Sequence, residues 1–259
     1  MVKKVRLDAL MVSQGLVETR AKAQALVMAG KVMLGDLRQD KAGVQVPPDA
    51  NIVLKTDSPW VSRGAYKLLG AIDAFPWLAD AMVDADCLDI GASTGGFTDV
   101  LLAHGARSVS AVDVGYGQLH WRIQSDPRVT VLDRTNIRTL EPNVLPATPS
   151  VATCDASFIS VTLFMDVVWR ELGAEGVFVV LVKPQFEAGR NDVGEGGVVR
   201  DESVRTATLE RVKTCALEVG FSIAGAVDSP IHGPSGNREF LLVLRKVAST
   251  QPPGNRDSV

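Results

Sequence analysis

The stretch Asp89-Ile90-Gly91-Ala92-Ser93-Thr94-Gly95-Gly96-Phe97-Thr98 decides the fold of this chain. It follows an apolar segment, 87–90, with the composition of a buried strand, and it opens a segment, 96–104, with the composition of a helix. Glycines at such a turn let the backbone approach a ligand at the carboxyl edge of a parallel sheet. The stretch therefore predicts a ligand site at the start of an α/β domain.

Strand and helix patterns alternate along the chain from about residue 61. This alternation predicts a doubly wound α/β domain with a seven-stranded, mostly parallel sheet. Only short turn segments separate the last two strands, so the last strand is expected to run antiparallel. The expected strands are 87–90, 108–112, 129–132, 151–154, 177–182, 221–227 and 239–245, and the expected helices are 64–74, 96–104, 117–124, 160–172 and 201–219.

The first part of the chain predicts a separate small α+β domain. Helix signals cover 6–14 and 19–29, and strand candidates follow at 31–34 and 52–55. Residues 1–67 hold 11 Lys and Arg against 6 Asp and Glu, whereas the rest of the chain is acidic. This asymmetry indicates either a module that binds a polyanion or ordinary scatter of solvated lysines. The expected division is 1–56 for this domain, 57–63 for a linker, 64–248 for the α/β domain and 249–259 for a disordered tail.

Composition argues against several classes of protein. The chain has 259 residues, of which 46% are hydrophobic, and its longest uninterrupted apolar run is the segment 177–182. A membrane span needs about 20 apolar residues, so none is expected, and polar residues interrupt any signal-peptide core. Three scattered cysteines predict a reduced, cytoplasmic protein without a disulfide framework. No His/Cys cluster has metal-ligand spacing, so no metal is expected, and the histidines are expected at the surface or hydrogen-bonded.

Two further carboxylates extend the ligand site. Asp113 ends the next strand, 22 residues after Gly91, where it can accept hydrogen bonds from both ribose hydroxyls of a nucleoside, and Asp133 could accept an adenine amino proton. The G-x-x-x-G-G spacing differs from the dinucleotide pattern G-x-G-x-x-G, so S-adenosylmethionine (SAM) is favoured over NAD, with a structural glycine turn as the remaining alternative. The expected SAM-binding residues are Asp89, Gly91, Ala92, Ser93, Thr94, Gly95, Gly96, Phe97, Thr98, Asp113, Val114, Asp133 and Asp155.

Two lysines and two acids lie at or near strand ends. Lys67 precedes the first strand of the larger domain, Asp155 and Lys183 directly follow two others, and Glu239 begins the last. Strand ends of an open α/β sheet line one crevice, so at least three of the four should converge. The pattern favours a reaction site, and the alternative is a pair of ordinary salt bridges at the rim of the sheet.

The chain resembles the TlyA family of ribosomal-RNA 2′-O-methyltransferases, also known as haemolysin A-like proteins, over roughly residues 4–246. The strings DIGASTGGFTDVLL, VKPQFEAGR, GGVVRD and GNREF carry the resemblance. Residues 6–32 resemble an RNA-binding domain of the ribosomal S-four type, and the remainder resembles the FtsJ type of methyltransferase. The resemblance implies a Rossmann-like SAM-dependent methyltransferase fold, a cytoplasmic enzyme, and the catalytic tetrad Lys67, Asp155, Lys183 and Glu239.

The implied reaction is an in-line transfer of the SAM methyl group to a ribose 2′-hydroxyl of ribosomal RNA or ribosomal subunits, with cytidine as the suggested target. A free 2′-hydroxyl does not ionise near pH 7, so a base must remove its proton, and the resemblance nominates neutral Lys183. Phe158 is expected either to stack on a splayed base or to lie in the core. The glycine-rich segment 188–198 is expected to be a mobile loop. The expected RNA contacts are Arg6, Arg20, Lys22, Lys31, Lys41, Arg63 and Phe158.

Two other functions remain open at this point: a binding-only protein without activity and a pore-forming haemolysin. An intact set of four site residues argues against the first. The lack of a long apolar segment or an amphipathic membrane helix in the sequence argues against the second.

Overall fold

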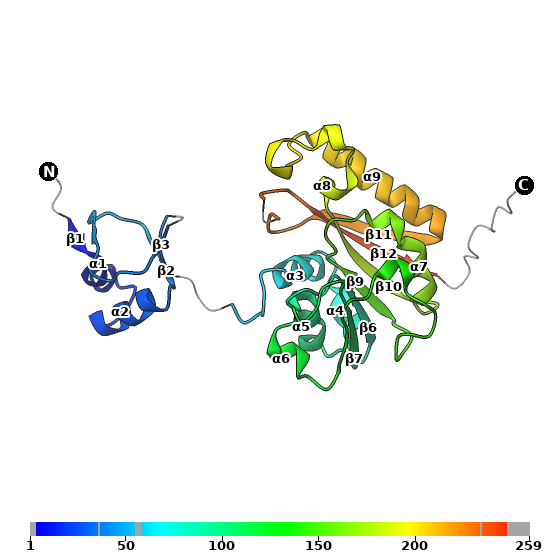
Figure 1. Cartoon of the computed structure of the whole chain (residues 1–259), viewed down its shortest axis with the longest axis horizontal. Coiled ribbons are helices and arrows are strands. Elements are labelled where there is room, and N and C mark those ends of the chain that lie inside the picture. Colours follow the sequence, from blue (N-terminus) through cyan, green and yellow to red (C-terminus); the bar gives the residue numbers. More distant parts are fainter. Residues whose placement is uncertain (1–3, 36, 55–57, 234, 248–259) are drawn as a thin grey trace, which may run out of the picture. The chain divides into compact units, whose positions relative to one another are not determined.

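The computed structural model describes residues 4–35, 37–54, 58–233 and 235–247 of the chain (Figure 1). The chain divides into two compact units, Met1–Pro59 and Trp60–Val259. This division falls inside the segment 57–63 that was expected to be a linker. The predicted tail, 249–259, and Lys55, the predicted end of a strand, lie outside the described residues.

The first unit packs two helices against short antiparallel strands. Its apolar core includes Leu7, Met11, Ala23 and Val27, which bring the two helices together. The Thr19 hydroxyl accepts a hydrogen bond from the Lys22 amide and caps the second helix. The elements are β1 (Val5–Arg6), α1 (Leu7–Ser13), α2 (Arg20–Met28), β2 (Val32–Leu34), β3 (Leu37–Gln39), β4 (Gln45–Val46) and β5 (Ile52–Leu54).

Both predicted helices of this unit are present, and so are its two predicted strands as far as the described residues reach. The strands β1, β3 and β4 were not predicted, because two or three residues are too few to establish an alternating pattern. β1 pairs with β4, and β2 lies between β3 and β5 in a second sheet.

The second unit contains a seven-stranded sheet in the order β11-β12-β10-β9-β6-β7-β8. Only β12 runs antiparallel to its neighbours, as predicted. The strands are β6 (Asp86–Ile90), β7 (Ser108–Val112), β8 (Val129–Leu132), β9 (Val151–Cys154), β10 (Val177–Val182), β11 (Phe221–Asp228) and β12 (Phe240–Lys246). The helices are α3 (Ala65–Ala74), α4 (Trp77–Met82), α5 (Gly96–Ala103), α6 (Trp121–Gln124), α7 (Met165–Glu171), α8 (Pro184–Glu187) and α9 (Glu202–Val219), and the 3-10 turns are η1 (Ile137–Thr139), η2 (Val161–Leu163), η3 (Arg190–Asp192) and η4 (Glu195–Gly197).

Two predicted helices are shorter or broken in the structure. The segment 117–124 is helical only over α6, since Gly117 adopts a left-handed φ of 64° ahead of it. The segment 160–172 divides into η2 and α7 at Phe164, whose backbone (φ −143°, ψ 12°) is neither helical nor extended. The short helices α4 and α8 were not predicted. Pro76 is the N-cap of α4 and Pro184 is the first residue of α8, a position where a helix tolerates proline.

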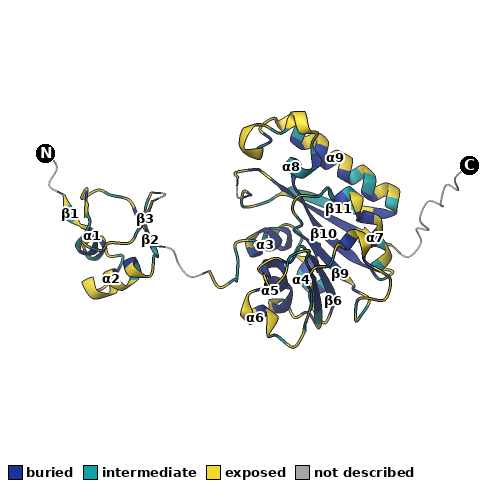
Figure 2. Cartoon of the chain, in the orientation of Figure 1, coloured by how far each residue is buried: buried dark blue, intermediate teal, exposed yellow. Residues whose placement is uncertain are grey.

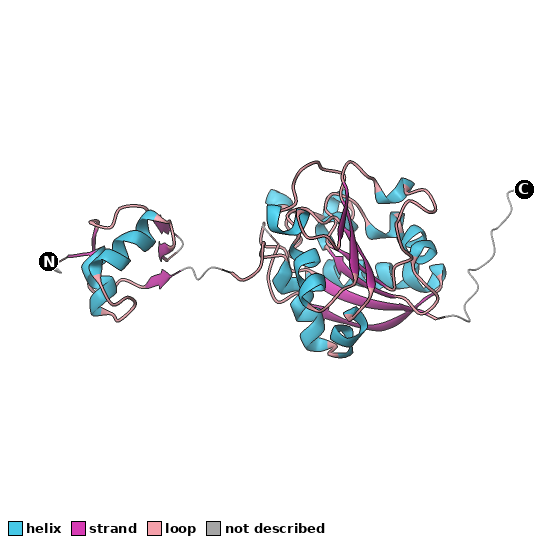
Figure 3. Ribbon diagram, turned by 90° about the horizontal axis from the view of Figure 1, so that it is seen from below, coloured by secondary structure: helices cyan, strands magenta, loops and turns pink. Residues whose placement is uncertain are grey.

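Successive side chains along a strand of the sheet are buried on opposite faces. On β10, Val179 and Leu181 pack with residues of α3 and α5, whereas Phe178 and Val180 pack with residues of α7 and α9. Figure 2 shows the strands dark blue between helices that are exposed on their outer sides, and Figure 3 shows helices on both sides of the sheet. The carboxyl ends of the parallel strands, together with the start of β12, therefore meet at one edge of the sheet.

Candidate active site

The glycine-rich loop between β6 and α5 needs its glycines because its backbone lies very close to neighbouring residues. Gly91 and Gly95 adopt left-handed φ values of 74° and 92°. A Cβ atom on Gly91 would lie 2.8 Å from the Ala156 Cα, in the segment that follows β9. A side chain at this position would therefore separate the loop from the strand end that carries Asp155.

A cavity of about 380 Å³ lies at the outer side of this loop. The Asp113 carboxylate at its wall accepts hydrogen bonds from the Ser93 amide (2.8 Å) and the Gly115 amide (2.7 Å). Each carboxylate oxygen still has a lone pair available, which is the acceptor set that the two ribose hydroxyls of an adenosyl group require. Its lining is Ile90, Gly91, Ser93, Val112, Asp113, Val114, Gln118, Thr135, Asn136, Ile137, Asp155, Ala156, Ser157, Phe158 and Ile159.

Three of the predicted cofactor residues form hydrogen bonds within the protein. Asp89 is fully buried and accepts hydrogen bonds from the hydroxyls of Thr98 (2.6 Å) and Thr153 (3.0 Å), so both Asp89 and Thr98 face the protein interior. The Asp133 carboxylate accepts a hydrogen bond from the Gly117 amide (2.9 Å), and its contact with a ligand stays a prediction. The side chains of Asp89 and Thr98 hold the start of α5 against β6 and β9, and their contact with a ligand also stays a prediction.

Burial also changes the acidity of Asp89. Removal from water raises the pKa of its carboxyl to about 6, because the charged form loses hydration and the two threonine hydroxyls only partly replace it. Asp155, a second carboxylate nearby, acts in the same direction.

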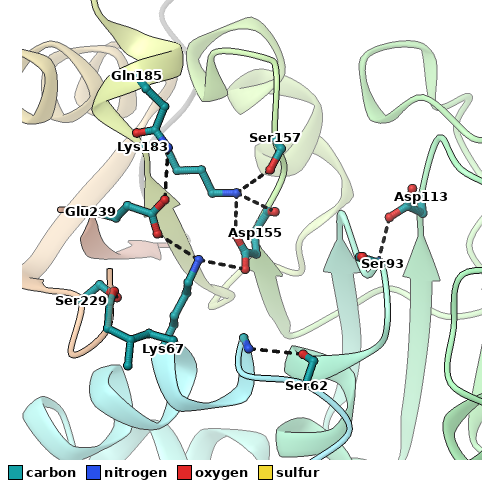
Figure 4. A network of polar contacts seen from close by, with 12 residues as sticks. Ser62, Lys67, Ser93, Asp113, Asp155, Ser157, Lys183, Gln185, Ser229 and Glu239 are labelled. Atoms are coloured by element: carbon teal, nitrogen blue, oxygen red, sulfur yellow. Dashed lines mark hydrogen bonds and ion pairs between the residues drawn. The ribbon is translucent and has the colours of Figure 1, made fainter. Parts of the chain in front are cut away.

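Lys67, Asp155, Lys183 and Glu239 meet at the sheet edge, as the strand-end argument predicts (Figure 4). Lys67 Nζ lies 2.9 Å from Glu239 Oε2 and 3.4 Å from Asp155 Oδ2. Lys183 Nζ lies 2.6 Å from Asp155 Oδ1. Asp155 therefore joins the two lysines, and the four groups form one charge-balanced chain.

Each of the four side chains is carried by an element that fixes its position. Lys67 lies on α3, Asp155 follows β9, Lys183 follows β10, and Glu239 directly precedes β12. The prediction that Glu239 begins the last strand is off by one residue, since β12 starts at Phe240. The lysine side chains are 8% and 7% exposed, so water competes little for their contacts.

Two residues that the sequence analysis did not single out hold this cluster. The Lys183 ammonium donates to the Ser157 hydroxyl (2.8 Å) and to the Asp155 carbonyl oxygen (3.1 Å). The Gln185 side-chain amide donates to Glu239 Oε1 (3.2 Å). Ser157 lies two residues after Asp155 and Gln185 two residues after Lys183, so proximity to a strand end was the available signal.

A second cavity of about 300 Å³ opens beside the two lysines. It shares Gly91, Ser93, Asp155 and Ser157 with the first cavity, so the two spaces adjoin at the cluster. Its lining is Ser62, Arg63, Gly64, Lys67, Gly91, Ala92, Ser93, Thr94, Gly96, Phe97, Asp155, Ser157, Lys183, Ile231 and His232.

The histidines divide between two kinds of environment. His104 contacts the Val100 carbonyl oxygen (2.9 Å), and His120 accepts from the Arg122 amide (3.2 Å), so these two are hydrogen-bonded as expected. His232 instead lines the second cavity, a position that the sequence analysis missed. Its segment follows the carboxyl end of β11, which was the signal for it. Within the described ranges no group of three or more His, Cys, Asp or Glu residues could hold a metal ion.

Phe158 is exposed, which excludes the alternative that it belongs to the core. Its side chain is 90% exposed, its φ is 65°, and its ring centroid lies 5.1 Å from that of Phe186. Because Phe158 lines the first cavity, its ring stands at the rim of the site. The segment 188–198 contains η3, η4 and an isolated bridge between Gly194 and Val198, and its mobility stays a prediction.

The predicted basic contacts of the first unit are partly committed to carboxylates. Arg6 and Arg20 both contact buried Asp8, and Lys22 Nζ lies 3.8 Å from Glu18. Lys31 is half-buried and Lys41 is exposed, whereas Arg63 lines the second cavity of the larger unit. Among the described residues, no helix combines the length and apolar character that crossing a membrane requires.

The two units of the chain match two different known protein families. The FtsJ-like methyltransferase family matches residues 60–246, and the S4 domain family matches residues 5–52. A Mycobacterium tuberculosis protein named 16S/23S rRNA (cytidine-2′-O)-methyltransferase TlyA is 44% identical over 247 residues, which cover 95% of this chain and 91% of that protein.

Solved structures of other proteins also resemble this chain. A structure from Streptococcus thermophilus that is named a hemolysin is 43% identical, covers 98% of this chain and 92% of its own, and has a TM-score of 0.73. The N-methyltransferase NodS from Bradyrhizobium japonicum is only 16% identical, with a TM-score of 0.51 over 74% of this chain and 93% of its own, and shares the fold. The chain thus belongs to the TlyA family of SAM-dependent methyltransferases, with an S4 domain ahead of an FtsJ-like methyltransferase domain.

Proposed function

We propose that this protein methylates the ribose 2′-hydroxyl of a cytidine in ribosomal RNA. The observation that carries the proposal is the buried, charge-balanced cluster of Lys67, Asp155, Lys183 and Glu239, which opens onto a cavity beside the glycine-rich loop. The ribosomal RNA and the cytidine come from the name of the relative in Mycobacterium tuberculosis, which is 44% identical.

Lys183 is the proposed base. In its neutral form the amine accepts the proton of the 2′-hydroxyl as that oxygen becomes a nucleophile. The Ser157 hydroxyl and the Asp155 carbonyl oxygen accept hydrogen bonds from Nζ and thereby fix the amine at the edge of the cavity. SAM supplies a methyl group that is already activated by its sulfonium, so positioning accounts for much of the acceleration.

Lys67, Asp155 and Glu239 are proposed to position Lys183 and the ribose. Asp155 contacts both lysines, and Glu239 holds Lys67 at 2.9 Å. Because Lys67 and Lys183 both line the second cavity, the ammonium of Lys67 is available to the ribose or the adjoining phosphate of the target nucleotide.

The first cavity is the proposed place of the adenosyl group of SAM. Asp113 would accept from the ribose hydroxyls, with Val114, Gly91 and Ser93 along the same wall. Asp113→Ala should weaken SAM binding about tenfold, because two hydrogen bonds to a charged acceptor are lost. Calorimetry with SAM measures this change. Asp73→Ala, which removes an exposed carboxylate of α3 that lines neither cavity, is the matched control, and equal losses in both variants would contradict the assignment.

The target base is proposed to leave its stack and to lie against Phe158. A ring that is 90% exposed at the rim of the site offers the surface on which such a base stacks. The S4 domain would hold the RNA through Arg6, Arg20, Lys22, Lys31 and Lys41, and Arg63 would contact it beside the reaction site. An enzyme with this substrate works in the cytoplasm, where ribosomes are assembled.

The decisive experiment incubates the purified protein with labelled SAM and ribosomal subunits from a host that lacks the modification. Incorporation into RNA, followed by a reverse-transcription stop that is sensitive to 2′-O-methylation, should identify a cytidine. Lys183→Ala protein is the control for contaminating activity. Label on a base or on protein, or no incorporation with either subunit or with naked RNA, would overturn the proposal.

The hemolysin name of the Streptococcus thermophilus structure raises membrane permeabilisation as a second function. Dye-filled liposomes with micromolar protein test it directly. We expect no leakage above that caused by an unrelated basic protein, and leakage would revive this function.

A further inference from the structure

The S4 domain carries a buried carboxylate whose partners are two of the proposed RNA contacts. Asp8 is fully buried, and its carboxylate accepts from Arg6 Nε (3.0 Å), Arg6 Nη2 (3.0 Å), Arg20 Nη2 (2.9 Å) and Gln24 Nε2 (2.9 Å). A buried charge needs this degree of pairing, because an unpaired one costs several kcal/mol. The question is what the arrangement does beyond stabilising the domain.

The backbone around Asp8 is fixed on both sides. Arg6 pairs with Gln45 between β1 and β4, and the Asp8 amide donates to the Ala42 carbonyl oxygen (3.0 Å). Arg20 occupies the first position of α2, directly after the Thr19 cap. Both arginine side chains therefore start from rigid points before the carboxylate fixes their far ends.

The carboxylate holds the two guanidinium groups side by side. Nη2 of Arg6 and Nη2 of Arg20 contact the same oxygen, Asp8 Oδ2. A guanidinium has five N–H donors, and these contacts use two from Arg6 and one from Arg20. The arginine side chains remain 46% and 54% exposed. Two adjacent cations with donors facing solvent match the closely spaced phosphates of an RNA strand.

We propose that Asp8 is a positioning residue for RNA binding, which fixes Arg6 and Arg20 as a paired phosphate clamp. The Gln24 side-chain amide donates to the same carboxylate and helps to hold it. The inference rests on the proposed function and adds the residue that aligns the phosphate contacts. A flexible arginine loses side-chain freedom when it binds, and a pre-aligned one has already lost it. Asp8 also cancels one positive charge of the cluster. Electrostatics alone therefore predicts that removing Asp8 strengthens RNA binding, whereas the loss of positioning predicts weaker binding.

Removing the carboxylate separates these two views by the sign of the change. In Asp8→Asn protein the arginines lose their anchor while the net charge of the domain rises. We expect the dissociation constant for in vitro transcripts of 16S and 23S rRNA to rise about tenfold, as filter binding of the full-length protein measures. Tighter binding with a steeper salt dependence would overturn the proposal, because Asp8 would then act only as a local counter-charge.

Charge-conserving variants keep the test valid if Asp8→Asn protein does not fold. Arg6→Lys combined with Arg20→Lys leaves every charge in place but removes the forked donors, and we expect about a threefold to tenfold loss of affinity at unchanged salt slope. Among the described residues, the Asp8 carboxylate accepts from Arg6, Arg20 and Gln24. Arg38→Lys, at an exposed arginine of the same domain, is therefore the matched control. Wild-type affinity in the double variant would overturn the proposal.

The result also distinguishes this inference from the proposed function. Wild-type protein that binds rRNA while all variants bind equally well would overturn only the role of Asp8. Wild-type protein that binds neither transcript would overturn the role of Asp8 together with the assignment of an rRNA substrate.

Discussion

The two units of the chain each contain a cluster of carboxylates and cations, but only one of them buries its cations. In the methyltransferase domain both lysines of the cluster are nearly inaccessible, at 8% and 7% exposure. In the S4 domain the carboxylate of Asp8 is inaccessible, whereas Arg6 and Arg20 are about half exposed. The first arrangement withdraws the amines from water, and the second presents cations to it.

This difference corresponds to different chemical tasks. An amine that must accept a proton benefits from a site where water does not compete for it. A cation that must bind a phosphate has to remain accessible, and a buried anion behind it fixes its direction without covering it. Lysine in the first cluster and arginine in the second follow the same division, because lysine can lose its proton and arginine cannot.

The largest effect is expected from a substitution that removes Lys183 from the cluster of the methyltransferase domain. Lys183→Ala should reduce methyl transfer about a thousandfold, because the proposed base is lost, while SAM binding stays nearly unchanged. Single-turnover transfer to ribosomal subunits and calorimetry with SAM measure the two quantities. Lys213→Ala, which removes a half-buried lysine of α9 paired with exposed Glu210, is the matched control. Lost SAM affinity with residual transfer would contradict the role of Lys183.

The second prediction tests whether burial makes this cluster important for stability. Glu239→Gln leaves Lys67 buried with only the longer contact to Asp155, so the free energy of unfolding should fall by about 3 kcal/mol. All four tryptophans lie in Trp60–Val259, so their fluorescence in urea reports on this unit. Glu210→Gln, which breaks an exposed pair with Lys213, should cost less than about 1 kcal/mol. Equal costs would mean that burial does not distinguish the two pairs.

The sequence predicted the two clusters unequally, for a physical reason. Asp155 and Lys183 directly follow apolar strands, so the rule that parallel strands end at one edge was enough to bring them together. The contact of Arg20 with Asp8 depends on how α1 packs against α2, which no local pattern specifies. The inward orientation of Asp89 likewise depends on Thr153 from a neighbouring strand.

The third prediction addresses the accessible cations. Arg20→Ala combined with Lys22→Ala should weaken binding to rRNA transcripts about tenfold at moderate salt. The dependence of affinity on salt should also become shallower. The magnitude of the slope of log affinity against log salt should fall by between about 1 and 2, because each lost phosphate contact contributes about 0.7–0.9. Filter binding over a series of salt concentrations measures the slope. Lys213→Ala in the other unit is the control, and an unchanged slope in the double variant would move the RNA site away from α2.

The smallest expected effect is a difference between the two units in how the ionisation of a buried carboxyl group changes stability with pH. Cationic partners lower the pKa of Asp8, with Arg6 as the main cause, whereas burial among neutral hydroxyls raises the pKa of Asp89 to about 6. Asp89 takes up a proton in the folded state before the unfolded chain does, so its contribution to stability rises by about 1 kcal/mol between pH 6 and pH 5. Asp8 has the opposite sign, because its contribution is present above its ordinary pKa near 4 and is lost as the pH falls below it.

Both signs can be measured in the full-length protein. Urea unfolding followed by tryptophan fluorescence should show wild-type protein gaining stability over Asp89→Asn protein as the pH falls from 6 to 5. Hydrogen exchange of peptides from α1 and α2 should show protection decreasing below pH 4 in wild-type protein and changing less in Asp8→Asn protein, which has no carboxylate there to protonate. If both units instead lost stability over the same range and the substitutions changed neither profile, the partners of the two carboxyl groups would not control their ionisation.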